Sequence, residues 1–174
     1  MELENCVKAI LYTYPKFKMI DRDYADHIEN KAILSYRYKG STESLAEYIA
    51  GEILRKRRLS VLKKALDEFF LSLTLEETIL LELRYFGKIR LMKDGGKDKG
   101  VSEWQRVCGS AERQAVIAQF HWSERSYYRK QNRLLKKVME GFNRMGFTKE
   151  VLEKEYMQYE FLRAVYRFLT AKKK

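Results

Sequence analysis

The sequence predicts an all-α protein. Its 174 residues contain one proline and many Leu, Lys, Glu and Tyr residues, a composition that favours helices because few positions break them. Hydrophobic residues make up 45% of the chain and aromatic residues 13%, which is enough for a packed core. We expect three parts: a helical amino-terminal region 1–72 for packing or oligomerisation, a helical region 73–146 with an inserted loop 88–100, and a carboxy-terminal helix with a basic tail, 147–174.

Three helices are expected in the amino-terminal region. The first covers about 2–14 and ends or turns at Pro15, because proline lacks the amide hydrogen that a helix interior needs. The second covers about 17–38, although AILSYRY at 32–38 could also form a short strand, and the third covers about 42–70. The expected apolar stripe of the third helix consists of Leu45, Ile49, Ile53, Leu54, Leu62, Leu66 and Phe69.

Two features stand out within this third helix. The run Arg-Lys-Arg-Arg at 55–58 points in several directions on a helix, so we interpret it as a solvated face, with a secondary phosphate contact as the alternative. Gly51 indicates either a bend or a close contact between helices.

A capping box opens the next helix. Thr74 and Glu77 have the spacing at which each side chain satisfies the backbone amide of the other residue. The helix is expected to end at Phe86, before a glycine-rich loop at 88–100 and a short helix at about 102–107.

Two helices joined by a tight turn are expected between 109 and 142. Ser123 is the predicted N-cap of the second helix, and Glu124 suits the positive end of the helix dipole. The stretch from 125 to 139 contains six Lys or Arg residues and no acid. The predicted semi-apolar face consists of Tyr127, Gln131, Leu134, Val138 and Phe142.

The last expected helix covers about 148–169. Its apolar face is broad, so it either returns to the core or contacts a partner helix. The final AKKK is expected to be a frayed basic tail.

The net positive charge of the chain comes from its second half. Residues 1–86 contain 14 basic and 14 acidic residues, whereas 87–174 contain 21 basic and 10 acidic residues, which accounts for the net charge of +11. A neutral half joined to a basic half indicates that the second half faces a polyanion.

The segment from 73 to 138 resembles region 4 of the sigma-70 family. The resemblance lies in LTLEETILLELRYFG, which begins at Leu73, and in SERSYYRKQNRLLKKV, which begins at Ser123. Compact phage-type transcription regulators of the ArpU and RinA kind also look like this. The resemblance implies a helical amino-terminal part followed by a sigma region 4-like helix-turn-helix.

The resemblance also implies roles for several residues of the second helix. Tyr127 would take the buried position after the cap. Trp122 in the turn is expected to pack the two helices together, with stacking on a base as the alternative. The implied base contacts are Glu124, Arg125, Tyr128 and Arg129. The implied phosphate contacts are Lys130, Arg133, Lys136 and Lys137.

Three features depart from the sigma-70 pattern. Some twenty additional residues separate Phe86 from the helix-turn-helix, Ile117 replaces a small residue, and His121 replaces the glycine of the turn. The last two features bear on how tight the turn is and how deeply the second helix enters a groove.

Several classes of site are not predicted. Cys6, Cys108, His27 and His121 are far apart in the sequence, so we expect free thiols and no metal site. We find no catalytic constellation and expect neither enzymatic activity nor a cofactor. We also see no signal peptide and no membrane-spanning run, so a cytoplasmic location without membrane contact is expected.

The leading hypothesis is a sequence-specific, double-stranded DNA-binding transcription regulator whose recognition helix covers about 124–139. The first alternative is a small sigma factor that binds core RNA polymerase. That alternative needs a region 2, which we cannot place in the neutral residues 1–70. A further alternative is a non-enzymatic helical interaction or phage assembly protein. A homodimer, formed by the amino-terminal helices or the last helix, would read two half-sites.

Overall fold

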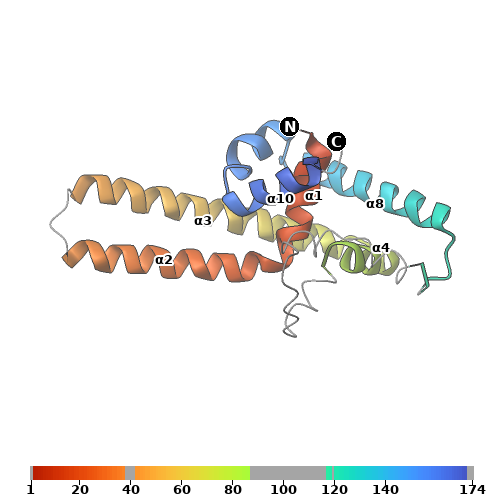
Figure 1. The fold of residues 1–174 in the computed structure, drawn as a ribbon, viewed down its shortest axis with the longest axis horizontal. Helices are drawn as coiled ribbons and strands as arrows, with labels where there is room; N and C mark the ends of the chain where they lie inside the picture. The colour runs from red at the N-terminus through yellow and green to blue at the C-terminus, as the bar shows by residue number, and fades with distance from the viewer. Residues whose placement is uncertain (1, 38–41, 87–116, 119, 172–174) are drawn as a thin grey trace. The chain divides into compact units, whose positions relative to one another are not determined.

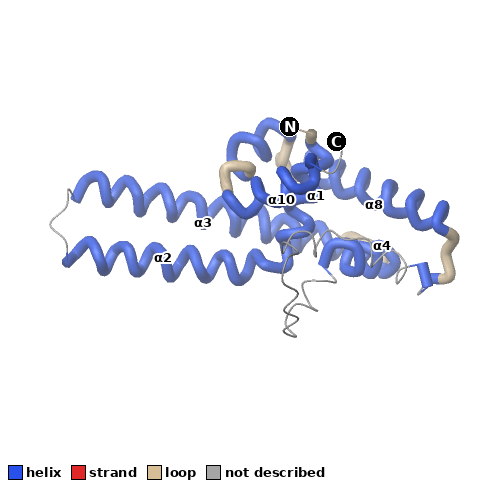
Figure 2. Tube along the Cα trace, viewed as in Figure 1, coloured by secondary structure: helices blue, strands red, loops and turns tan. Residues whose placement is uncertain are grey.

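The all-α prediction is confirmed by the computed structural model shown in Figure 1. The structure describes residues 2–37, 42–86, 117–118 and 120–171. Within these ranges the chain forms helices and short connections, and no strand is present (Figure 2). The strand alternative for 32–38 is therefore excluded as far as Arg37. The predicted loop 88–100, the short helix 102–107, Cys108 and the tail at 172–174 lie outside the described residues.

The chain divides into two compact units. One unit consists of residues 1–15 and 69–174, and the other consists of residues 16–68. The first helix therefore belongs to the same unit as the second half of the chain, although a whole unit separates them in the sequence.

The unit 16–68 is a helical hairpin. It contains α2 (Phe17–Arg37) and most of α3 (Thr42–Leu71), which lie side by side and run in opposite directions (Figure 1). Ser60 Oγ donates a hydrogen bond of 3.0 Å to the carboxylate of Asp21. Farther along the hairpin, Nε2 of His27 lies 2.8 Å from the hydroxyl oxygen of Tyr48, and the two atoms share a hydrogen bond. Among the side chains of this unit whose burial the structure describes, the buried apolar ones are Phe17, Leu59, Leu62 and Leu66.

The predicted apolar stripe of α3 is right in its second half and wrong at two positions. Leu62 and Leu66 are buried, but Ile53 and Leu54 keep 50% and 53% of their surface exposed. The acidic side chain between Gly51 and Ile53, Glu52, is only 6% exposed. The buried face follows heptad spacing back through Leu59 to Glu52, and this register turns Ile53 and Leu54 away from it.

Helix α1 (Leu3–Thr13) forms the centre of the other unit. It packs chiefly against α10 (Glu160–Ala171), so the last helix returns to the core, which was one of the two expected outcomes. Burial raises the pKa of the Cys6 thiol to about 11, so this cysteine stays protonated and inert at neutral pH. The buried residues of α1 are Asn5, Cys6, Val7, Ala9, Ile10, Leu11, Tyr12 and Thr13.

The last predicted helix is broken. The segment begins with α9 (Lys149–Val151) and the π-helical η4 (Leu152–Tyr156), and a turn separates these from α10. The amide of Met157 donates to the carbonyl of Leu152 at 2.9 Å, which closes a turn wider than an α-helical one. The prediction of one continuous helix over 148–169 is therefore wrong.

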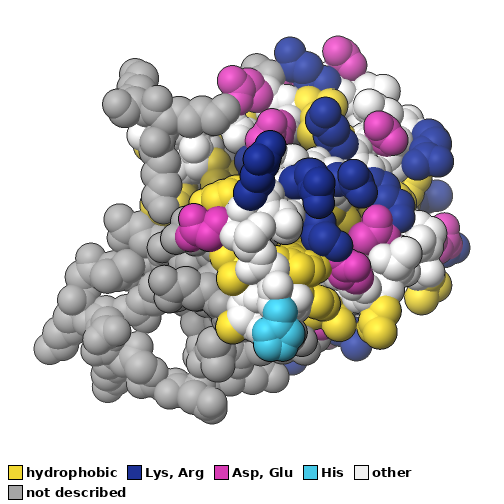
Figure 3. Space-filling model, turned by 90° about the vertical axis from the view of Figure 1, so that its right-hand side faces the viewer, with side chains coloured by type: hydrophobic (Ala, Val, Ile, Leu, Met, Phe, Trp, Pro, Cys, Tyr) yellow, Lys and Arg dark blue, Asp and Glu magenta, His cyan; other side chains and the backbone are white. Residues whose placement is uncertain are grey.

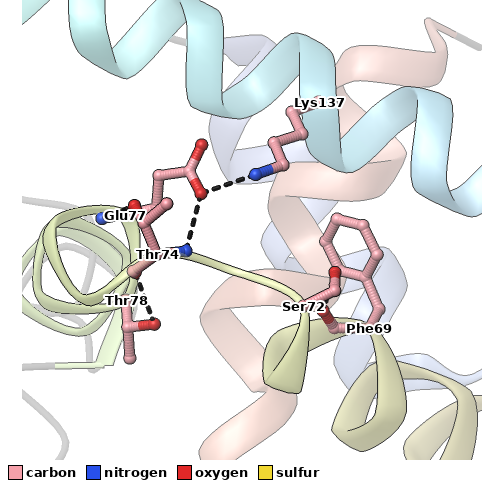
Figure 4. A network of polar contacts seen from close by, with 6 residues as sticks. All are labelled: Phe69, Ser72, Thr74, Glu77, Thr78 and Lys137. Carbon is pink, nitrogen blue, oxygen red and sulfur yellow. Dashed lines mark hydrogen bonds and ion pairs between the residues drawn. The ribbon is translucent and has the colours of Figure 1, made fainter.

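The capping box is confirmed at the start of α4 (Leu75–Leu81). Thr74 Oγ1 accepts a hydrogen bond of 3.3 Å from the amide of Glu77, and the Glu77 carboxylate accepts one of 2.9 Å from the amide of Thr74 (Figure 4). The predicted helix continues as the π-helical η2 (Glu82–Phe86). The buried side chains of these two elements are Leu80, Leu81, Tyr85 and Phe86.

Helix α8 (Glu124–Arg144) ends in a glycine turn. Gly146 has a φ of +85°, in the left-handed region that glycine adopts without steric cost. The amide of Phe147 donates to the carbonyl of Phe142 at 2.9 Å, and that of Gly146 donates to Asn143 at 3.1 Å. The rings of Phe142 and Phe147 also contact each other. This arrangement is a Schellman motif with its hydrophobic contact.

Gly141 and Gly51 provide a matched test of the packing. A Cβ added at Gly141 would lie 2.8 Å from Cδ2 and 2.9 Å from Cζ of Phe69, whereas one added at Gly51 would meet nothing within 4 Å. Alanine gains about 1 kcal/mol of helix propensity over glycine, but overpacking costs about 1–3 kcal/mol. We expect Gly51→Ala to raise the free energy of unfolding by about 1 kcal/mol and Gly141→Ala to lower it. Urea denaturation of both variants checks this, and equal stabilisation by both would contradict the close contact at Gly141.

Candidate nucleic-acid interface

The turn before α8 is tight although it lacks a glycine. Ile117, Ala118 and Phe120 are helical, and α8 begins at Glu124. The amide of Trp122 donates to the carbonyl of Ile117 at 3.1 Å, and that of His121 donates to Ala118 at 3.4 Å. His121 has a φ of 51°, so it adopts the left-handed conformation of the glycine that it replaces. Residues 109–116 and 119, in the first of the two predicted helices, lie outside the described residues.

The predicted N-cap of α8 is confirmed. Ser123 Oγ accepts a hydrogen bond of 3.2 Å from the amide of Ser126, which satisfies one of the free amides at the start of the helix. Tyr127, the residue expected to be buried after the cap, is 1% exposed. Gln131 is half-buried. The buried side of α8 consists of Tyr127, Leu134, Leu135, Val138, Gly141 and Phe142.

Trp122 packs within the protein, as expected. Its ring stacks on that of Phe120, with 4.4 Å between the centroids and an angle of 13° between the planes. The ammonium of Lys130 lies over the Trp122 ring at 4.5 Å from its centroid, a distance at which a cation is attracted to the face of an indole. The Trp122 side chain therefore connects the segment before α8 with the second helical turn of α8, where Lys130 lies.

Two ion pairs join α8 to α4. Lys130 pairs with Glu76, and Lys137 pairs with Glu77 at 2.6 Å (Figure 4). Burial alone would raise the pKa of Glu77, but the hydrogen bonds from Lys137 and from the Thr74 amide, with the positive charge of Lys137, hold that pKa below its usual value. Thr74, Glu76 and Glu77 line a shallow hollow between the two helices, together with Lys130 and other α8 residues.

The predicted contact residues of α8 that form no ion pair with α4 are exposed to solvent. All four predicted base contacts are exposed, as are Arg133 and Lys136 of the predicted phosphate contacts. Arg125, Arg129, Arg133 and Lys136 make no ion pair with any carboxylate in the described ranges. Figure 3 shows Lys and Arg side chains gathered on one face of the molecule, with acidic side chains among and around them.

The exposed stripe of α8 includes a residue that the sequence did not single out. Arg125, Arg129, Asn132 and Lys136 follow one another at steps of four, three and four residues, and all are exposed. That spacing keeps them on one side of a helix. Periodicity in the sequence could have indicated Asn132, since it occupies the same face as the two arginines.

Other kinds of site are not found in the described part of the chain. No group of three or more His, Cys, Asp or Glu side chains there could hold a metal ion. Nor does any described helix combine the length and the apolar character that are needed to cross a membrane. No known protein family, curated protein or solved structure matches the chain.

The left-handed backbone conformation of His121 leads to a prediction about stability. A side chain in this conformation costs about 1–2 kcal/mol, and part of that is offset because glycine is more flexible in the unfolded chain. We expect His121→Gly to raise the free energy of unfolding by about 0.5–1 kcal/mol. Gly146→Ala, at the other left-handed position, should have the opposite effect. Thermal unfolding measures both, and destabilisation by His121→Gly would contradict the described turn.

The lowered pKa of Glu77 predicts a pH dependence. A carboxyl group whose pKa is lower in the folded than in the unfolded state stabilises the fold above the unfolded value of about 4.3. This contribution is lost as the pH falls through the lowered, folded-state pKa. We expect Glu77→Gln to lose less stability than the natural protein between about pH 6 and about pH 3. Unfolding curves across that range check this; parallel losses in both proteins would contradict it.

Proposed function

We propose that the chain is a sequence-specific, double-stranded DNA-binding transcription regulator that inserts the amino-terminal turns of α8 into the major groove. The observation that carries the proposal is the division of α8. One face is buried and anchored, while the other presents Arg125, Tyr128 and Arg129 from the first two turns to solvent. Ser123 and Glu124, at this end of the helix, are also exposed.

The exposed residue types suit the edges of base pairs. An arginine can donate two hydrogen bonds to O6 and N7 of guanine, and a glutamate can accept from N4 of cytosine. Arg125 and Arg129 are the residues expected to grip guanine, and Glu124 is the candidate for cytosine. The major groove is about 12 Å wide and admits a single helix, so these residues would enter it together.

Exposed cations near the groove would supply the affinity that does not depend on sequence. Arg133 and Lys136 lie beyond the first two turns of α8. Contacts from such residues to phosphates release counterions, and they make binding weaken as salt increases. The net charge of +11 favours attraction to DNA over a longer range.

Selection of bound duplexes from fragmented genomic DNA tests the proposal. We expect the natural protein to enrich one motif and the Arg125→Ala/Arg129→Ala variant to lose it. Arg129→Ala alone should cost about 1–3 kcal/mol of discrimination at one base pair. Arg57→Ala/Arg167→Ala is the matched control, because it removes the same charge from exposed positions on α3 and α10.

Two outcomes would contradict the proposal. If the natural protein enriches no motif, α8 does not read sequence, and binding to core RNA polymerase or to another protein becomes the question for pull-down experiments. If the control variant loses the motif as well, general charge and not the face of α8 determines binding.

A further inference from the structure

The four predicted phosphate contacts of α8 differ in their ion pairs with α4. Lys130 and Lys137 are separated by seven residues, lie on the side of the helix that faces α4, and are each paired with a carboxylate there. Their side chains are 32% and 34% exposed. Lys136 is exposed on the outer stripe, and Arg133 is exposed although it also lines the hollow between α4 and α8. Neither residue pairs with a described carboxylate.

Lys130 is held by two partners from different segments. Its ammonium pairs with Glu76 of α4 and also lies over the ring of Trp122, in the turn before α8. Trp122 in turn stacks on Phe120. Lys130 thus connects α4, the turn and α8, which are the parts that determine how the first turns of α8 are presented.

Lys137 is tied to the capping box of α4. The Glu77 oxygen that accepts from Lys137 at 2.6 Å also accepts from the Thr74 amide at 2.9 Å (Figure 4). If Lys137 moved to a phosphate, Glu77 would lose the cation that neutralises it. The uncompensated carboxylate would then lie close to the negative charge of the DNA, which opposes such a move.

We propose that Lys130 and Lys137 are positioning residues that remain paired with Glu76 and Glu77 on DNA, and that Arg133 and Lys136 supply the phosphate contacts of α8. This inference rests on the proposed function. The sequence assigns the same phosphate-binding role to Lys130, Arg133, Lys136 and Lys137. The inference divides these four residues into two that position the helix and two that contact phosphates.

The salt dependence of binding tests the inference. The probe is a fluorescently labelled duplex of mixed sequence, titrated between about 50 and 200 mM salt. Each phosphate contact contributes about 0.9 to the slope of log K against log salt, or about 3.5-fold in affinity over this range. We expect Lys136→Gln to lower the slope by about 0.9 and Lys130→Gln or Lys137→Gln to leave it unchanged. A lower slope in either of the last two variants would overturn the inference.

A double-mutant cycle sharpens the test. In a Glu76→Gln protein, Lys130 has lost its carboxylate and is free to approach a phosphate. Lys130→Gln should therefore lower the slope by about 0.9 in the Glu76→Gln protein but not in the natural one. Equal effects in both proteins would show that Glu76 does not hold Lys130 away from DNA.

Hydrogen exchange provides a readout that needs no DNA. Partly exposed ion pairs are worth about 0.2–1 kcal/mol, so Lys130→Gln and Lys137→Gln should accelerate exchange of the α4 amides by up to about fivefold. Lys136→Gln is the matched control and should leave that exchange unchanged. Unaltered α4 exchange in the first two variants would overturn the positioning role. Absence of any duplex binding by the natural protein would instead count against the proposed function.

Discussion

The buried face of α8 is the constraint on which the candidate site depends. Tyr127 is 1% exposed, and Val138 and Phe142 are fully buried. Because an α-helix repeats every 3.6 residues, fixing these side chains in the core also fixes the direction of every other side chain on the helix. Arg125 and Arg129 face solvent as a consequence of this packing. The orientation of the candidate base-reading residues is therefore a property of the core.

Local interactions at the two ends of α8 determine where the helix begins and ends. Ser123 caps its start, and Gly146 turns the chain after its end. His121 closes the preceding helix by the same pattern of hydrogen bonds that Gly146 uses, although a side chain is less favourable in that conformation. The core, the cap and the two left-handed residues thus act together to present one short stretch of α8.

The sequence predicted what depends on local rules. The capping box at Thr74, the cap at Ser123 and the burial of Tyr127 follow from spacing and residue type, and the structure has all three. Features that depend on tertiary packing were not accessible in this way. By hydrophobicity, Leu54 is a better candidate for the core than Glu52. The register of the α2–α3 hairpin nevertheless buries Glu52 and leaves Leu54 exposed. The pairing of Lys130 and Lys137 with α4 depends on a contact across more than fifty residues of sequence.

Methylation of guanine N7 in the selected duplex tests the central claim most directly, because this atom lies in the major groove and is the acceptor that an arginine of α8 would contact. If α8 reads the major groove, methylation at the motif's guanines should abolish binding, and methylation outside the motif should have no effect. If the protein binds the fully methylated motif as tightly as the unmodified one, it does not read guanine through the major groove, and the role assigned to Arg125 and Arg129 is wrong.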